Sequence, residues 1–449
     1  MKRMLNKNSI KSILLIVFVF LFSFAAHLNP VIPVFFTALY LLFTFSTPNF
    51  KNYDFKQISF LLLTEFAIGY FILKAGFNFY CLPILIVPML AALLFNSVEI
   101  PFFLSLANSV TLASLTTEPF KAFLIFFISS IAAILALKGA RRRSTIIHAG
   151  LISGILQLIT LILLESFVFS QPQRYVTILI TGLLSGIIVL GVLPVFEYLL
   201  QTVTNISLLE LADTHQPLLQ RLVMEAPGTY HHSLIVGNLS ETACNAVGAN
   251  ALLARIGAYY HDIGKLHKPE YFIENQNIQT NVHDALTPTI SKLVIMNHVK
   301  EGIELAKKYR LSPMLWNFIQ QHHGKSLVYY FYRRALEGKE EDQEVTEDGF
   351  RYPGPKPNSK ETAIVLLADS VEAATRTLKE PTPSKIEDLV HRIINNKFID
   401  GQLDECELTL KDIEKISGVF IKILGGIYHS RIAYQENQEQ QANSKNGKS

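Results

Sequence analysis

The first 200 residues of this 449-residue chain contain a series of long apolar runs, and this feature restricts the possible folds more than any other. A helix needs roughly 20 apolar residues to cross the hydrocarbon core of a bilayer. Eight runs approach that length: Ile13 to His27, Val31 to Ser46, Ile58 to Leu73, Tyr80 to Phe95, Pro101 to Leu115, Phe120 to Leu137, Thr145 to Val168 and Val176 to Leu200. Residues 1–200 are therefore predicted to form a polytopic helix bundle in a lipid bilayer.

The two halves of the chain differ in charge. Up to Leu200 there are thirteen Lys or Arg and six Asp or Glu, whereas the remainder has 27 basic and 31 acidic residues. Residues 201–434 are thus predicted to form a soluble domain, and the polar segment 435–449 a disordered tail. The net charge of +3, without a dense basic run outside the membrane flanks, gives no reason to expect binding to long nucleic acids.

Basic residues beside the apolar runs predict the orientation in the cell membrane. With eight spans, three basic clusters and the C-terminal domain all lie in the cytoplasm. In the alternative, the first run is a signal peptide with Ser23 and Ala25 placed for cleavage, which leaves seven spans and an external N-terminus. Both versions predict a cytoplasmic C-terminal domain. The clusters are Lys2, Arg3, Lys7 and Lys11; Lys51 and Lys56; and Lys138 with Arg141, Arg142 and Arg143.

Two carboxyl groups, Glu65 and Glu165, fall inside apolar runs. An ionisable group in hydrocarbon is costly, so each raises the hypothesis of a ligand or ion site. Since the sequence shows no paired cation, the favoured interpretation is a protonated or interface-facing carboxyl.

The second half has the pattern of an all-helical domain. Amphipathic helices are predicted at Ala251 to Tyr260, Pro288 to Lys300, Pro313 to Gln321 and Glu361 to Leu378, with a long loop from Glu337 to Lys360. The three cysteines, Cys81, Cys244 and Cys406, form no C-x-x-C pair, so a metal site in this chain must use imidazoles and carboxylates.

Eleven of the thirteen histidines lie in this half, several of them in or at the end of predicted helices. Imidazoles and carboxylates that face one core are costly unless they are paired, and a shared metal centre supplies the pairing. Such ligands suit divalent ions, and two ions about 3.5 to 4 Å apart can clamp a phosphate and convert water to hydroxide. The ordered set predicted as ligands is His232, His261, Asp262, His298, His322, His323 and Asp369.

Lys265 follows Asp262 by one turn and is predicted to neutralise a nonbridging phosphate oxygen, with a solvated lysine as the alternative. His231 fits a supporting or a solvent-facing role equally well. The other histidines are interpreted as surface or capping residues: His215, His267, His283, His391 and His429.

Several separated motifs occur in the order seen in a known family. They are Ala226-Pro-Gly-Thr-Tyr-His-His-Ser233, His261-Asp-Ile-Gly-Lys265, His298, His322-His323, Tyr352-Pro-Gly-Pro-Lys-Pro357 and Ala368-Asp-Ser-Val-Glu-Ala-Ala374. Together they resemble the seven-transmembrane HD phosphodiesterases that hydrolyse cyclic di-AMP. The likeness covers about Asn205 to Tyr434, and more loosely the membrane part.

The resemblance implies an all-helical HD domain with a two-metal site, of iron or manganese, that converts cyclic di-AMP to the linear dinucleotide pApA. It also implies how the ligands divide. His232, His261, Asp262 and Asp369 would hold one ion, and Asp262, as a bridge, would hold the other with His298, His322 and His323.

Two comparisons with the family refine this expectation. Family members usually carry a large extracytoplasmic domain after the first hydrophobic segment, whereas only Leu28 to Pro30 separate the first two runs here. External sensing through such a domain is therefore not expected. The related cyclic di-GMP branch has a Gly-Tyr-Pro motif after its paired histidines, and His322-His-Gly-Lys-Ser-Leu327 leads on without one. This favours the di-AMP branch.

Three hypotheses for the function follow. The first is an active cyclic di-AMP phosphodiesterase. The second is an HD hydrolase of another nucleotide, such as cyclic di-GMP or a mononucleotide. The third is a membrane receptor whose HD domain binds a nucleotide without cleaving it, although such domains usually lose ligands and every expected ligand is present here. A homo-oligomer is compatible with all three.

Overall fold

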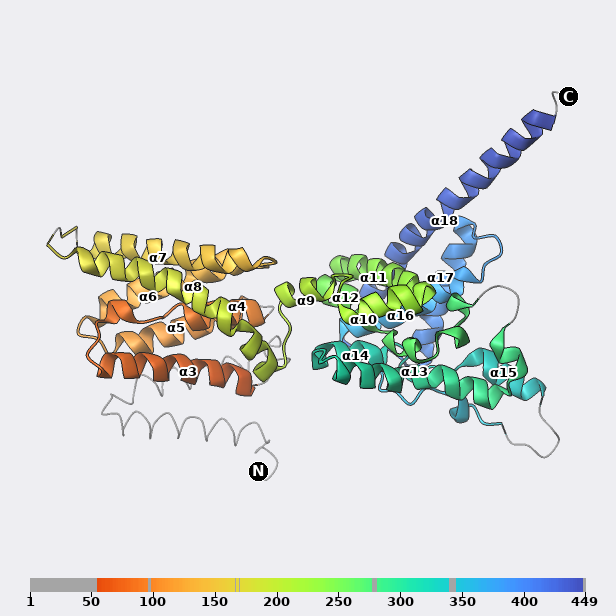
Figure 1. The fold of residues 1–449 in the computed structure, drawn as a ribbon, viewed down its shortest axis with the longest axis horizontal. Helices are drawn as coiled ribbons and strands as arrows, with labels where there is room; N and C mark the ends of the chain where they lie inside the picture. The colour runs from red at the N-terminus through yellow and green to blue at the C-terminus, as the bar shows by residue number, and fades with distance from the viewer. Residues whose placement is uncertain are drawn as a thin grey trace. The chain divides into compact units, whose positions relative to one another are not determined.

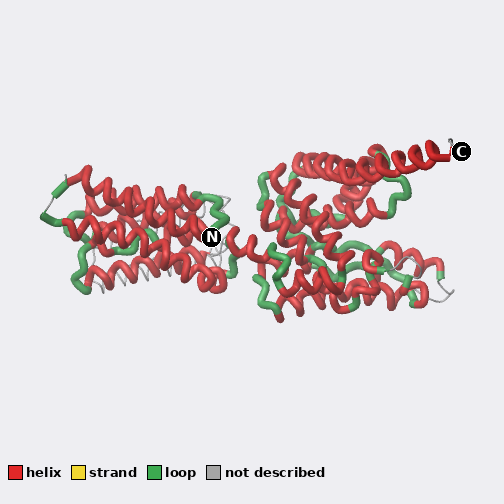
Figure 2. The backbone as a smooth tube through the Cα atoms, turned by 45° about the horizontal axis from the view of Figure 1, so that its top comes forward, coloured by secondary structure: helices red, strands yellow, loops and turns green. Residues whose placement is uncertain are grey.

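The chain divides into two compact units, Met1–Ile206 and Ser207–Ser449. The computed structural model describes residues 55–95, 98–165, 167–168, 170–276, 281–338 and 345–446, with side chains between 57 and 428. Helices make up both units (Figures 1 and 2), and within the described residues the pairing of β type is one isolated bridge between Leu327 and Arg351. The all-helical fold class predicted from the sequence is confirmed.

Six of the eight predicted apolar runs lie within the described residues of unit 1, and each coincides with a helix. The first two runs, Ile13 to His27 and Val31 to Ser46, lie outside the described residues. The helices are α3 (Phe55–Lys74), α4 (Ile86–Leu94) preceded by the 3-10 turn η2 (Phe79–Cys81), α5 (Glu99–Ala113), α6 (Pro119–Leu137), α7 (Arg143–Glu165) and α8 (Pro172–Leu200).

Four of these helices, α3, α6, α7 and α8, are long and apolar enough to cross a membrane. The other two, α4 with 9 residues and α5 with 15, are shorter than the roughly 20 residues that a membrane span needs. Each of these helices has a proline in its first turn, Pro88 in α4 and Pro101 in α5. The first turn tolerates the missing N–H of proline.

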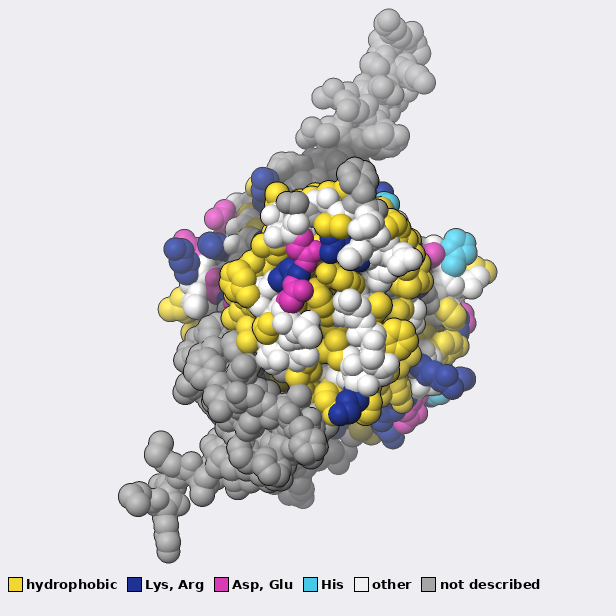
Figure 3. Space-filling view, turned by 90° about the vertical axis from the view of Figure 1, so that its left-hand side faces the viewer, with side chains coloured by type: hydrophobic (Ala, Val, Ile, Leu, Met, Phe, Trp, Pro, Cys, Tyr) yellow, Lys and Arg dark blue, Asp and Glu magenta, His cyan; other side chains and the backbone are white. Residues whose placement is uncertain are grey.

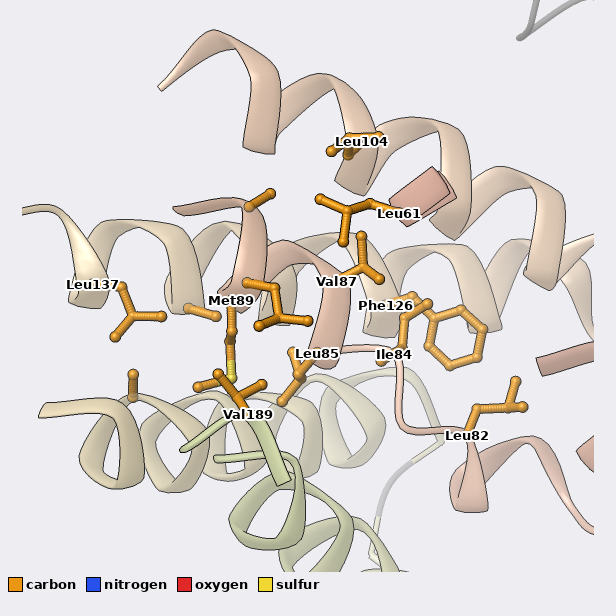
Figure 4. Packing of buried hydrophobic residues seen from close by; sticks show 14 of the residues in the cluster. Leu61, Leu82, Ile84, Leu85, Val87, Met89, Leu104, Phe126, Leu137 and Val189 are labelled. Atoms are coloured by element: carbon orange, nitrogen blue, oxygen red, sulfur yellow. The ribbon is translucent and has the colours of Figure 1, made fainter. Parts of the chain in front are cut away.

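Helix α4 lies at the centre of the described part of unit 1, because it packs against α3, α5, α6 and α8. Its residues Met89, Leu90 and Ala91 are fully buried. Figure 4 shows Met89 and Leu85 directed toward Val189 of α8, with Ile84 beside Phe126 of α6. The short helix thus fills the interior of the bundle and joins the longer helices around it.

Helices α7 and α8 form an antiparallel pair whose backbones approach closely at four glycines. A Cβ atom added to Gly182 would lie 2.6 Å from Cα of Gly154 and 2.9 Å from the carbonyl oxygen of Gly150. Gly186 similarly faces the backbone of Ile146 and Ile147. Small residues at helix contacts are typical of membrane proteins, where association depends on close van der Waals packing.

Glu165, at the end of α7, is ion-paired with Lys121 of α6 and Arg174 of α8. Lys121 also pairs with Glu118, and Figure 3 shows acidic and basic side chains gathered within a largely hydrophobic end of the bundle. The sequence showed no paired cation for Glu165, whereas the structure supplies two. The two cations come from 44 and 9 residues away in the sequence, and the helix packing brings them together.

Unit 2 contains nine α-helices among its described residues, together with the part of α9 beyond Ile206. Proline occupies the first turn of α13 and α14, and the Asn250 side chain caps α12. The helices are α9 (Asn205–Leu211), α10 (Pro217–Glu225), α11 (Pro227–Val247), α12 (Ala251–Tyr260), α13 (Pro288–Lys308), α14 (Pro313–Gln321), α15 (Tyr329–Glu337), α16 (Lys360–Arg376), α17 (Pro383–Ile399) and α18 (Leu410–Asn446).

The core of unit 2 is built around α11, α12 and α16, which pack against one another, while α14 packs on α12, α13 and α16. The seven residues from Ala363 to Asp369 in α16 are all buried. A helix buried on all sides is the expected place for side chains that must be kept from water.

Two connecting or terminal segments differ from the sequence expectations in detail. The loop expected from Glu337 to Lys360 contains the turn η7 (Asp348–Phe350) among its described residues, and Tyr352 N donates to the Ser326 carbonyl. The backbone of α18 continues as helix to Asn446, into the segment from Gln435 for which disorder is predicted. That segment is rich in Gln and Glu, which favour helix; its disorder in solution stays a prediction.

Candidate metal centre

Five helix ends or helix interiors in unit 2 direct imidazoles and carboxylates to one buried point. His232 lies in the second turn of α11, and Asp369 lies in the interior of α16. The remaining residues come from the end of α12, from α13 and from the end of α14. These are His261 with Asp262, His298, and His322 with His323. The structure therefore brings together all seven residues predicted as metal ligands.

The carboxylate of Asp262 lies between two groups of imidazoles. Its Oδ2 atom is 3.2 Å from Nε2 of His261 and 3.6 Å from Nε2 of His232. Its Oδ1 atom is 3.4 Å from Nε2 of His298 and 3.5 Å from Nε2 of His322. Each oxygen thus faces one pair of histidines.

Asp369 and His323 complete the two groups. Asp369 Oδ1 lies 3.0 Å from Nε2 of His232, and Asp369 Oδ2 lies 3.5 Å from Nδ1 of His323. Two of the resulting clusters have donor atoms that all lie within 4.8 Å of one another: His232, His261 and Asp369, and His298, His322 and His323. Asp262 stands between these clusters and, with His261 and His322, forms a third.

Four histidines have their Nδ1 atoms engaged away from the centre. Nδ1 of His261 lies 2.6 Å from the Ala258 carbonyl oxygen, and that of His322 lies 3.0 Å from the carbonyl oxygen of Ile319. Nδ1 of His298 bonds to the carbonyl oxygen of Ile295 in the same way. Because a carbonyl oxygen only accepts, each Nδ1 donates to it, and each Nε2 is the nitrogen that would bind a metal once it is deprotonated. This arrangement orients histidines that bind metal.

The fourth such histidine, His232, uses a carboxylate instead of a carbonyl. Its Nδ1 lies 2.5 Å from Oε2 of Glu372, one turn beyond Asp369 on α16. Glu372 is not among the residues predicted from the sequence. The available signal was its spacing, since residues three apart on a helix share a face and Asp369 was already in the predicted set.

The donor atoms fit divalent ions. Within the described residues, Nε2 of His261 and Oδ1 of Asp262 are buried and have no hydrogen-bond partner. Orphaned buried polar atoms are costly, and both belong to residues of the clusters described above. Nitrogen and carboxylate oxygen donors without thiolates are the set that borderline divalent ions prefer.

Electrostatics keep Asp262 ionised although it is buried. Burial opposes its charge, but the neighbouring charges of His261 and Lys265 outweigh burial and hold the pKa of Asp262 well below its usual range. At His298 and His323 the neighbouring charges do not outweigh burial, so the neutral form is favoured. Burial lowers the pKa of His298 to about 4 and that of His323 well below its usual range. These two imidazoles are therefore neutral near pH 7 and can act as ligands.

Lys265 lies beside the predicted bridge. Its Nζ is 2.8 Å from Oδ2 of Asp262 and 2.6 Å from Oε1 of Glu274, which the sequence analysis did not identify. Burial disfavours the charge of Lys265, yet Asp262 and Glu274 outweigh this and raise its pKa. The alternative of a solvated lysine is excluded, because the side chain is only 13% exposed.

The structure also places three residues outside the predicted ligand set, Tyr352, His283 and His231. Tyr352, of the Pro-rich loop, stacks on His323 with ring centroids 4.3 Å apart, so this loop covers the site. His283, expected at the surface or as a cap, is buried and bonds through Nε2 to the Tyr271 carbonyl oxygen. His231, left open in the sequence analysis, is exposed.

An open pocket of about 310 Å³ adjoins the centre at His298. Phe272 and Lys268 line it from one side, and Leu293 and Asn297 of α13 line it from the other. The pocket gives a small molecule access to the edge of the metal centre.

Two family models match the chain. The model described as "HD domain" matches residues 229–374, which contain all seven predicted ligands. The model described as "7TM receptor with intracellular HD hydrolase" matches residues 13–204. The first covers the core of unit 2 and the second covers nearly all of unit 1.

Curated relatives carry both parts. The cyclic-di-AMP phosphodiesterase PgpH of Bacillus subtilis (strain 168) is 43% identical over 317 residues, which are 69% of this chain and 44% of that protein. PgpH of Listeria monocytogenes serotype 1/2a (strain 10403S) is 38% identical over 370 residues, 80% of this chain and 51% of that protein. The chain thus spans about half the length of these relatives.

A solved structure is also similar. The crystal structure of the L. monocytogenes phosphodiesterase PgpH HD domain in complex with cyclic-di-AMP is 45% identical in sequence. The match covers 48% of this chain and 100% of the chain in that crystal structure, with a TM-score of 0.46. The matches to both parts, in the same order along the sequence, confirm the predicted resemblance: the chain belongs to the family of 7TM receptors with an intracellular HD hydrolase.

Proposed function

We propose that this protein is a metal-dependent phosphodiesterase that hydrolyses cyclic di-AMP to pApA and so lowers the level of this second messenger. The observation that carries the proposal is the position of Asp262, whose two oxygens face two separate groups of histidines. The relatives named cyclic-di-AMP phosphodiesterase PgpH support the choice of substrate. The reaction adds water to one phosphorus and breaks one P–O3′ bond, and the 3′ oxygen leaves with a proton.

Two divalent ions, which we propose to be iron or manganese, would supply an electrophilic clamp for the phosphate and an activated water. His232, His261, Asp262 and Asp369 would hold one ion. Asp262 would share the other with His298, His322 and His323. The geometry of Asp262 supports this division, since each of its oxygens lies nearest to the histidines of one group.

Lys265 would stabilise negative charge on the phosphate during hydrolysis. An ammonium group has three N–H donors. The contacts to Asp262 and Glu274 use two of them, which leaves one N–H for a nonbridging phosphate oxygen. Glu274 would hold the lysine in place, because its Oε1 also accepts from the Thr229 hydroxyl at the start of α11.

The membrane helices would anchor the domain at the cell membrane, with the HD domain in the cytoplasm, where a nucleotide second messenger is found. The basic residues Arg141 to Arg143 precede α7 and support this orientation. A cysteine probe in that loop that reacts with a membrane-impermeant reagent outside intact cells would contradict it.

The test of the proposed function uses the purified full-length protein in detergent with Mn²⁺ or Fe²⁺. Cyclic di-AMP, cyclic di-GMP and a mononucleotide are supplied separately, and the products are identified by mass spectrometry. We expect cyclic di-AMP to give pApA and His232→Ala to abolish this turnover. The control His231→Ala should retain turnover, because the His231 side chain is exposed. Preferential turnover of another nucleotide, or binding without turnover, would replace the proposal with one of the alternatives.

A further inference from the structure

Glu65 of α3 lies inside unit 1, and one of its two carboxyl oxygens has a hydrogen-bond partner among the described residues. The residue is 5% exposed. Its Oε2 accepts a hydrogen bond from the Asn108 side chain of α5. Its Oε1 is buried and has no hydrogen-bond partner within the described residues. In an apolar interior an unsatisfied oxygen is costly, so the side chain is suited to a partner that comes from outside the chain.

A cavity of about 160 Å³ adjoins this carboxyl group. Its walls come from α3, from α4 and the segment leading into it, from α5 and from α8; Figure 4 shows Leu82 and Ile84 of that segment and Val87 of α4. Apart from Glu65 and Thr64, every lining residue is apolar. The Thr64 hydroxyl already donates to the Phe60 carbonyl oxygen, which leaves Glu65 as the polar anchor of the cavity.

The size and lining of the cavity indicate the class of molecule that fits. A dry cavity of roughly 150 Å³ lined by Leu, Ile and Phe holds a molecule of the size of benzene. A water molecule needs two to four polar partners, and here it would meet one unsatisfied oxygen. The apolar walls therefore favour a small lipophilic body over water.

We propose that this cavity binds a small lipophilic molecule with a single hydrogen-bond donor. The donor, an alcohol O–H or an amine N–H, bonds to Oε1 of Glu65, and the apolar body contacts residues such as Leu112 and Val192. The hydrogen bond from Asn108 fixes the carboxyl group in the orientation that presents Oε1.

The second carboxyl in an apolar run serves as an internal comparison. Glu165 is paired with both Lys121 and Arg174, so its two oxygens are satisfied by the chain itself. Among the described residues, Glu65 has one hydrogen-bond donor, Asn108, and an adjoining cavity. The two residues looked equivalent in sequence, and their surroundings assign a ligand to Glu65 alone.

The test uses the full-length protein in lipid nanodiscs and three ring compounds that differ in the head group: 4-fluorobenzylamine, 4-fluorobenzyl alcohol and 4-fluorotoluene. Binding is followed by fluorine NMR, and empty nanodiscs of the same lipid correct for partition into the bilayer. We expect saturable binding of at least one donor compound, about tenfold or more tighter than 4-fluorotoluene, as for a buried hydrogen bond. The stronger of the two donors identifies the head group.

Two variants separate the anchor from the cavity. Glu65→Leu removes the acceptor, so the preference for a donor over 4-fluorotoluene should disappear. Val192→Phe fills the cavity and leaves Glu65 in place, so saturable binding of all three compounds should be lost. Equal binding of the donors and 4-fluorotoluene to the unaltered protein, or unchanged donor binding in Val192→Phe, overturns the proposal. The readout does not depend on nucleotide hydrolysis, so it is independent of the proposed enzymatic function.

Discussion

Glu372 accepts a hydrogen bond from Nδ1 of His232 at 2.5 Å, while Nε2 of the same ring lies 3.0 Å from Asp369 on the side of the metal centre. Both acids are on α16, and Arg376 Nε lies 2.6 Å from the other oxygen of Glu372. One helix therefore supplies a proposed metal ligand and the group that orients a second ligand.

The first prediction concerns this contact. Glu372→Leu removes the acceptor, so His232 can rotate or change tautomer, and metal affinity should fall by roughly 10 to 100-fold. Glu372→Gln keeps a hydrogen-bond acceptor, so its metal affinity should fall less than that of Glu372→Leu. Competition with a chelator measures the affinity directly, and exposed Glu380 provides the control Glu380→Gln. Equal affinity in all three variants would rule out the orienting role.

Asp262 should be required for both ions. Replacement by Ala removes the carboxylate whose oxygens face both groups of histidines, so the protein should lose both metals and nearly all hydrolysis. Metal content of the purified full-length protein, measured by mass spectrometry, tests this. A variant that retains two metals and near-normal cleavage would refute the bridging assignment. Treatment of the unaltered protein with a chelator should abolish activity, and added Mn²⁺ should restore it.

Lys265 should affect the rate and spare the metals. Lys265→Ala removes the charge proposed to stabilise the phosphate, and the loss of such a contact costs on the order of 10²-fold in kcat. Lys300→Ala removes an exposed charge two residues from His298 and serves as the control. Metal content and kcat are measured on the same preparations, and a loss of metal in parallel with rate would assign a structural role to Lys265.

Gly264 should tolerate no side chain. A Cβ atom there would lie 1.8 Å from the carbonyl oxygen of His298 and 2.5 Å from the amide nitrogen of Gly302, both in the backbone of α13. Gly264→Ala must therefore shift α13 or the turn after Asp262, with a cost of about 1–3 kcal/mol or more. We expect a lower Tm and weaker metal binding. Gly418→Ala, at a site with open space, should leave both unchanged.

In unit 1, Gly182 is likewise expected to tolerate no side chain. Gly182→Ala places a Cβ atom 2.6 Å from Cα of Gly154, so α7 and α8 must separate, again at about 1–3 kcal/mol. Gly191→Ala on the same helix meets no atom within 4 Å. Thermal unfolding of the two variants in the same detergent should show a lower transition for Gly182→Ala. Indistinguishable transitions would show that the close approach does not stabilise the pair.

The sequence predicted those parts of the fold that depend on local signals. Helices α12 and α14 match their predicted ranges because Asn250 and Pro313 mark their starts and the apolar pattern stops at their ends. The seven residues that meet at the proposed metal centre were predictable because histidine and aspartate in such contexts are uncommon. Glu372 and Glu274 are ordinary acidic residues in sequence, and only the packing of α11 against α16 and against the turn at Glu274 reveals their partners.

The shorter helices of unit 1 were also less predictable, because their surroundings depend on helix packing. Hydropathy reports how apolar a run is, and it does not report whether the run faces lipid or other helices. Helix α4 was predicted as a span from its composition, yet the surrounding helices bury most of its residues. The roles of Glu65 and Glu165 likewise depend on residues distant in sequence.

The ion pairs of Glu165 also bear on how the protein is assembled in the bilayer. They lie at the end of α7 opposite Arg143, which is the end that must cross the membrane in the proposed orientation. Moving unpaired cations across hydrocarbon is expensive, and basic residues normally hold a loop on the cytoplasmic side. Lys121 and Arg174 each have a carboxylate within contact, so α6, α7 and α8 together carry nearly neutral pairs. Helix α6 has its own partner for Lys121 in Glu118, whereas α7 alone would carry the unpaired charge of Glu165 and α8 alone that of Arg174. Helices α7 and α8 are therefore expected to insert together, against α6.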